Sequence, residues 1–176
     1  AIDRGLGVDL TVVVETEPAG TAGALHYIAD QVEDRFLLLN GDTIFDADIL
    51  QLIRLQEQLC CPVVIALRHV EDTGPYGRVE MDHEGRLITY NEKNHCGPGW
   101  INGGIYWLKR EILAQLPPPP ASLEKDVFTA MVADGKVCGV VFDRFFLDIG
   151  RPETYSDASL LIGEWMAGIS PPSFIY

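Results

Sequence analysis

Basic residues are scarce in this sequence. Lys and Arg number 13 against 26 Asp and Glu, so the formal net charge is −13 at pH 7. Nucleic acids and anionic membranes are bound through stripes of cations that release counterions from phosphates, and the chain has no such stripe. The charge balance therefore argues against nucleic acid and membrane as partners. A small phosphorylated ligand is compatible with it, because one Mg²⁺ and two or three local cations can hold a nucleotide on an acidic protein.

Cysteine is also scarce: the chain has 4, with no C-x-x-C pair and no histidine at metal-ligand spacing. The adjacent Cys60 and Cys61 lie in an apolar run, which favours reduced thiols in the core and hence a cytoplasmic protein. No apolar stretch reaches the length of a membrane-spanning helix. The first residues lack the charged and apolar regions of a signal peptide, so we expect no export signal.

The length of 176 residues suits one domain, and 47% of the residues are hydrophobic, enough for a substantial core. We expect a single domain over residues 1–168. Residues 169–176 have the composition of a loose tail.

The stretch Arg35–Asp46 organises the rest of the prediction. Residues 36–39 form a continuous apolar run of strand length, and Asn40, Gly41 and Asp42 end it with turn chemistry. In open α/β sheets, ligands bind outside the carboxyl ends of the strands, which is where this places Asp42. We interpret Asp42 as a ligand of a divalent metal. The alternative is an ordinary turn aspartate.

Strands and helices alternate in the first part of the chain. The patterns predict strands over residues 9–15, 35–39 and 62–67 and helices over 22–32 and 49–59, with Thr21 capping the first helix and Asp46 or Asp48 the second. This order is typical of βαβ units. We therefore predict an α/β fold with a Rossmann-like, mostly parallel central sheet and helices on both faces.

The second part of the chain predicts a small antiparallel extension. Strands over residues 78–82 and 87–93 are joined by the turn 83–86, and a further strand covers 101–108. The remaining predicted elements are helices over 110–116, 123–133 and 152–166 and strands over 136–142 and 145–148.

Asp148 ends a strand in the same way as Asp42. Mg²⁺ is commonly held by one or two carboxylates together with phosphate oxygens of the substrate, so this pair is a candidate metal platform if the two strand ends are neighbours. The alternative for Asp148 alone is a strand-end cap.

Three glycine-rich or charged segments are candidate substrate contacts. The turn 18–23 contains Gly20 and Thr21 and leads into a helix N-terminus, where free N–H groups are available to a ligand. Glu92 can accept hydrogen bonds from hydroxyl groups, and Lys93 can hold a phosphate. Gly77 and the run 102–104 leave backbone open to a ligand. A capped turn, a solvated charge pair and hairpin sterics are the respective alternatives.

Taken together, these segments resemble the sugar-1-phosphate nucleotidylyltransferases. Seven motifs match the family in order along the chain, and each is weak alone. They are EPAGTAGAL (17–25), LLLNGDTIFDAD (37–48), YGRVEMD (76–82), NEK (91–93), INGGIYWL (101–108), SLEKDVF (122–128) and FLDIGRPETY (146–155). The fifth, sixth and seventh look most like the branch that acts on mannose or heptose 1-phosphate with GTP.

The resemblance implies roles for individual residues. Asp42 and Asp148 match the Mg²⁺ ligands, and Lys93 matches the lysine on the sugar phosphate. Gly20 and Thr21 match the turn that faces the nucleobase, and the sugar-binding positions are Gly77, Glu92, Asn102 and Gly104. The implied reaction joins a nucleoside triphosphate and a sugar 1-phosphate, with a sugar-phosphate oxygen attacking the α-phosphorus and pyrophosphate leaving.

The sequence also departs from the family. It has neither the opening strand nor the G-G-x-G-T-R-L type loop that grips the triphosphate, a difference on the order of 60 residues if one βαβ unit takes ~30. We therefore expect little or no activity from the isolated chain, and either a completing chain or a homo-oligomer that covers the exposed sheet. The first alternative function is a non-catalytic module that binds sugar phosphates. The second is a metal-dependent glycosyltransferase that uses Asp46 and Asp48.

Overall fold

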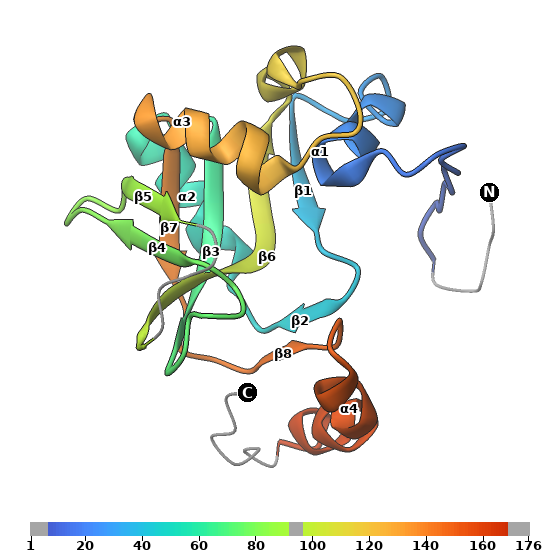
Figure 1. Ribbon diagram of the computed structural model, residues 1–176, viewed down its shortest axis with the longest axis vertical. Helices are drawn as coiled ribbons and strands as arrows, with labels where there is room; N and C mark the ends of the chain where they lie inside the picture. The colour runs from blue at the N-terminus through green and yellow to red at the C-terminus, as the bar shows by residue number, and fades with distance from the viewer. Residues whose placement is uncertain (1–6, 92–96, 169–176) are drawn as a thin grey trace.

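The computed structural model describes residues 7–91 and 97–168, and it shows a central six-stranded sheet with helices on both faces and a separate two-stranded ribbon (Figure 1). The strands are β1 (Arg35–Leu39), β2 (Thr43–Phe45), β3 (Val63–Val70), β4 (Arg78–Met81), β5 (Leu87–Asn91), β6 (Gly99–Lys109), β7 (Val137–Val141) and β8 (Phe146–Asp148). The α-helices are α1 (Gly20–Gly23), α2 (Ile49–Leu59), α3 (Thr129–Ala133) and α4 (Pro152–Met166). The shorter helical turns are η1 (Ala24–Tyr27), η2 (Arg110–Gln115) and η3 (Leu123–Phe128).

The long strand β6 determines the topology of the sheet. The order is β5-β4-β6-β3-β7, with β1 also paired to β6. Because β6 runs antiparallel to both β1 and β3, these two strands point the same way without being neighbours. Of the strand pairs in the described part of the chain, β3 with β7 alone is parallel. The prediction of a mostly parallel sheet is therefore wrong, because β6 occupies the position between the two strands of the predicted βαβ unit.

Strand β3 has a core on each side. Val63, Ile65 and Leu67 pack into the cluster that includes η3 and α3, whereas Val64 and Ala66 pack into the cluster that α2 covers. A strand buried on both faces is expected to read as a continuous apolar run, as this one does. Helix α2 begins and ends where predicted, and the Asp48 carboxylate caps it by accepting a hydrogen bond from Leu50 N at 3.0 Å.

The first predicted strand is absent. Residues 9–15 form no helix or strand, and Val14 is 78% exposed. The helix predicted over 22–32 is reduced to α1 and η1, and the cap is not Thr21, because α1 already begins at Gly20. Residues 123–133 form a π-helical segment followed by α3, and Ser122 caps the first turn by accepting a hydrogen bond from Lys125 N at 3.2 Å.

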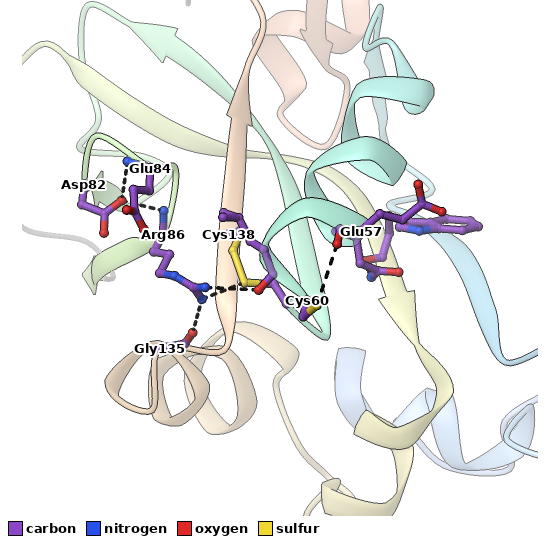
Figure 2. The surroundings of a disulfide bond; sticks show 11 residues. Glu57, Cys60, Asp82, Glu84, Arg86, Gly135 and Cys138 are labelled. Atoms are coloured by element: carbon purple, nitrogen blue, oxygen red, sulfur yellow. Dashed lines mark hydrogen bonds between the residues drawn. A yellow bond between two sulfur atoms is a disulfide. The ribbon is translucent and has the colours of Figure 1, made fainter.

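The prediction of reduced core thiols is wrong for Cys61, which is not reduced, and wrong in part for Cys60, which is reduced but not in the core. Cys61 forms a disulfide with Cys138, and Cys60 is a free thiol on the surface (Figure 2). The two bonded residues meet because β7 pairs with β3 in a register that places Cys138 opposite Val64, close to Cys61, which lies two positions before the start of β3. A separation of 77 positions hides this contact from spacing arguments.

Among residues 7–91 and 97–168, no helix combines the length and the apolar character needed to cross a bilayer. The predicted tail, residues 169–176, lies outside the described residues.

Candidate active site

Asp42 and Asp148 lie side by side although 106 positions separate them in the chain. The β2–β8 ribbon pairs Thr43 with Asp148, and Ile149 N donates to Asp42 O at 2.8 Å. A Cβ atom built on Gly150 would lie 2.9 Å from Asp42 Oδ2 and 3.1 Å from Asp148 Oδ1. The two carboxylates therefore face a common point, which the missing side chain of Gly150 leaves open.

This arrangement fits a hard divalent cation such as Mg²⁺. Carboxylate oxygens are the ligands that Mg²⁺ prefers, and the ion usually completes its shell with water and phosphate oxygens. The Gly150 N–H donates to Asp148 Oδ1 at 2.9 Å and so orients that carboxylate. Among the described residues, no group of three or more His, Cys, Asp or Glu is placed to hold a metal ion. The role of Asp42 and Asp148 as metal ligands stays a prediction.

Tyr76 stands next to the carboxylate pair. Its ring contacts Phe146 edge-on, with ring centroids 6.3 Å apart. Burial raises the pKa of Tyr76, a hydrogen bond with Arg151 opposes that rise, and the negative charge of Asp148 adds to it. The phenol therefore keeps its proton at neutral pH and remains a donor. The turn that carries Tyr76 also holds Gly77, whose φ of +89° suits glycine and whose N–H donates to Thr73 O at 2.9 Å.

A second group of side chains gathers around Tyr106, which is fully buried in β6. The Asn102 amide donates to Tyr90 Oη at 2.9 Å and to Tyr106 Oη at 2.8 Å, and its Oδ1 accepts from Gly104 N at 3.0 Å. Burial raises the pKa of Tyr106 well above its usual value. Asn102 and Gly104, both predicted sugar contacts, thus belong to one ordered network, in which Asn40 N also donates to Gly104 O at 2.8 Å.

Glu124 connects this network to the turn that holds Gly20 and Thr21. Its Oε2 accepts from Thr21 Oγ1 at 3.0 Å, and its Oε1 lies 3.5 Å from Tyr106 Oη. Gly20 has a φ of +76°, and a Cβ there would lie 2.4 Å from Ala121 O, so glycine is required for this close approach. Thr21 and Glu124 are 103 positions apart, so no local pattern in the sequence indicates their contact.

We expect Thr21→Val to destabilise the protein and Thr21→Ser to leave its stability nearly unchanged. The Thr21 hydroxyl accepts from the buried Leu123 N at 2.8 Å, and valine removes that acceptor. An orphaned buried N–H costs about 1–3 kcal/mol. Urea denaturation of both variants measures the difference. Equal stability of the valine and serine variants would show that this hydrogen bond contributes nothing.

Two of the candidate site residues, Glu92 and Lys93, lie outside the described residues, directly after the end of β5. The two residues of the glycosyltransferase alternative have structural contacts. Asp48 caps α2 and also accepts from Gln51 Nε2 at 3.1 Å, and Asp46 lies 3.6 Å from the Arg144 guanidinium.

Comparison with known proteins agrees with the motif pattern. The family model described as nucleotidyl transferase matches residues 2–164. The D-glycero-alpha-D-manno-heptose 1-phosphate guanylyltransferase of Campylobacter jejuni is 36% identical over 157 residues, which cover 87% of this chain and 67% of that protein. The mannose-1-phosphate guanylyltransferase of Mycobacterium tuberculosis is 32% identical over 171 residues, which cover 94% of this chain and 47% of that protein.

Solved structures give the same result. HddC from Yersinia pseudotuberculosis superposes with a TM-score of 0.77 at 30% identity, covering 91% of this chain and 70% of that one. Its complex with GMP-PN superposes with a TM-score of 0.69 over 85% of this chain. The chain thus spans about two thirds of the heptose relative and less than half of the mycobacterial one. With a family match that covers nearly all of its described residues, the chain belongs to the nucleotidyl transferase family.

Proposed function

We propose that this chain is a sugar-1-phosphate guanylyltransferase domain, which transfers a guanylyl group from GTP to a hexose or heptose 1-phosphate and releases pyrophosphate. The observation that carries the proposal is the convergence of Asp42 and Asp148 on the open point beside Gly150. Both named relatives act on a sugar 1-phosphate, and a homologous structure holds GMP-PN. The proposal includes a cytoplasmic location, where nucleotide sugars are made from these substrates.

The residues of the site bind and align more than they react. The attacking group, an oxygen of the sugar phosphate, is already anionic, so no side chain has to remove a proton from it. Asp42 and Asp148 would hold Mg²⁺, which offsets phosphate charge in the transition state. Gly20 and Thr21 would receive the base, and Gly77, Glu92, Asn102 and Gly104 the sugar, with Lys93 on its phosphate. The network around Tyr106 would fix the sugar and base sides relative to each other.

The open edge of β1 supports a partner that completes the sheet. Among the described residues β1 pairs with β6 alone, and Leu37 and Leu39 are 39% and 56% exposed. A free strand edge with apolar side chains is a surface for added strands. We propose that a completing chain, or a second copy of this chain, covers it, and that the site is fully active in that assembly.

We expect the purified chain to bind GDP-mannose in an Mg²⁺-dependent manner but to turn over slowly. Isothermal titration calorimetry with GTP, GDP-mannose and mannose 1-phosphate measures binding. Chromatographic detection of GDP-mannose measures turnover, which we expect below about 0.1 s⁻¹, against a median near 10 s⁻¹ for enzymes. Sedimentation of the same sample shows whether the chain is a monomer or a homo-oligomer.

The outcomes separate the candidate functions. Binding of the guanine nucleotides with Mg²⁺ supports the proposed domain. Tight binding of mannose 1-phosphate with no binding of GTP favours the non-catalytic module. Rapid turnover by the isolated chain would show that the site is complete without a partner.

A further inference from the structure

Three cysteines gather where α2 meets β3 and β7, away from the carboxylate pair. Cys60 ends α2 with a left-handed φ of +55°, Cys61 follows it, and Cys138 lies in β7. Cys61 and Cys138 are bonded and are 1% and 0% exposed, whereas the free thiol of Cys60 is on the surface. An accessible thiol is thus joined by one peptide bond to a buried disulfide.

The Arg86 guanidinium contacts one sulfur of this disulfide (Figure 2). Arg86 donates to Cys61 Sγ at 3.2 Å, to Gly135 O at 3.1 Å and to Leu59 O at 3.1 Å. A neighbouring guanidinium stabilises a thiolate, and in thiol–disulfide exchange the sulfur with the more stable thiolate leaves faster. Cys61 is therefore the favoured leaving group when the bond is attacked at Cys138.

We propose that Cys60, Cys61 and Cys138 form a thiol–disulfide exchange site, which an external dithiol reduces through Cys60. In the structure the Cys60 thiol donates to Glu57 O at 3.8 Å, as Figure 2 shows. For the exchange the side chain rotates away from that carbonyl, the thiol gives its proton to water, and the thiolate attacks Cys138 Sγ. The Cys60–Cys138 bond forms, the Cys61–Cys138 bond breaks, and Cys61 leaves as a thiolate beside Arg86.

The dithiol completes the reaction. One of its thiolates attacks the exposed Cys60 Sγ and releases Cys138, which takes up a proton. The second thiol of the reductant then attacks the mixed disulfide, so that Cys60 is released and the reductant becomes a cyclic disulfide. Two electrons pass from the dithiol to the protein, and all three cysteines end reduced.

The burial of the disulfide is the reason that its reduction proceeds through Cys60. The two bonded residues are almost inaccessible, so an external thiol has no direct path to either sulfur in the folded protein. Cys60 lies on the surface and next to Cys61, so it can accept the external thiol after the internal exchange.

The site is also an anchor for the β4–β5 hairpin. Gly139 N, next to Cys138, donates to Gly85 O at 2.8 Å, and Arg86 forms a β-bridge with Cys138. Reduction removes the covalent link that holds this part of β7 to the start of β3. We expect faster amide hydrogen exchange at Gly139 after reduction.

The test compares the rate of disulfide reduction by dithiothreitol in the full chain and in variants. Aliquots are quenched with N-ethylmaleimide and mapped by mass spectrometry. We expect the Cys61–Cys138 peptide in the wild type, and its loss to be at least about tenfold slower in Cys60→Ser, which lacks the attacking thiol. Cys60→Gly, which suits the left-handed backbone, is the second variant. Cys96→Ser is the matched control and should reduce at the wild-type rate.

Reduction of both Cys60 variants at the wild-type rate would overturn the proposal, and so would slow reduction of Cys96→Ser. Failure to find a Cys61–Cys138 peptide after incubation with oxidised glutathione would overturn it as well. None of these readouts depends on sugar-phosphate or nucleotide binding, so the exchange site and the proposed guanylyl transfer succeed or fail separately.

Discussion

Asp148→Asn should remove the Mg²⁺ dependence of GDP-mannose binding. In the wild type, Mg²⁺ on the two carboxylates would draw the diphosphate in, and we expect it to raise affinity about tenfold, within the range usual for coupled binding. In the variant the ion loses one of its two protein ligands. The loss of a negative charge also strengthens anion binding without metal. The affinity with Mg²⁺ therefore falls and the affinity without Mg²⁺ rises, so that the ratio of the two approaches one.

Calorimetry at matched ionic strength measures this ratio, and Asp42→Asn should behave in the same way. Asp46→Asn is the matched control, since it makes the same charge change close to the β2–β8 ribbon without facing Gly150. Loss of the Mg²⁺ effect in Asp46→Asn, with the effect retained in Asp42→Asn, would contradict the assignment. That result would instead favour the glycosyltransferase alternative.

Gly103→Ala should be strongly destabilising. A Cβ at this position would lie 2.4 Å from the Phe45 ring and 2.9 Å from Ala66 O, and the second of these atoms belongs to the backbone. Forcing extra volume into such a packed position costs about 1–3 kcal/mol, and we expect the upper part of that range. Because Phe45 lies on β2, its displacement should also disturb the nearby carboxylate pair.

Urea denaturation measures the effect, and Gly163→Ala in α4 is the control. The control position has no neighbouring atom within 4 Å, and alanine is favoured over glycine in a helix by about 1 kcal/mol. The control should therefore be as stable as the wild type or more so. Equal stability of the two alanine variants would show that the close contact at Gly103 is relieved without cost.

The elements that were predicted correctly are stabilised by contacts between residues close together in the sequence. Helix α2 was correct because the Asp48 cap and the spacing of its leucines lie within the same few residues. The β4–β5 hairpin was correct because its turn, with Asp82 accepting from Glu84 N and Arg86 N, closes on itself. The prediction of a strand over residues 9–15 was wrong because β-branched residues favour a strand only where a partner strand exists.

The sheet pairing and much of the site depend on contacts that the sequence does not encode locally. The hydrophobic pattern of a strand does not indicate which strand will pair with it, so the position of β6 in the sheet could not be predicted. The strand ends predicted Asp42 and Asp148 as candidates, but the β2–β8 pairing that brings them together joins residues 106 positions apart and has no local signal. Glu124 and Tyr106 were not predicted as site residues, because they contact side chains that are distant in the sequence.

The position of β6 has a consequence for the order of events during synthesis. Strands β1 and β3 are synthesised before their shared neighbour β6, which is complete only at Lys109. Until then the edge of each strand that β6 will cover is free, and long-range pairing of this kind is slow and exposes apolar surface. A nascent chain stalled before residue 99 should therefore recruit chaperones more strongly than one stalled after both β6 and β7 have emerged.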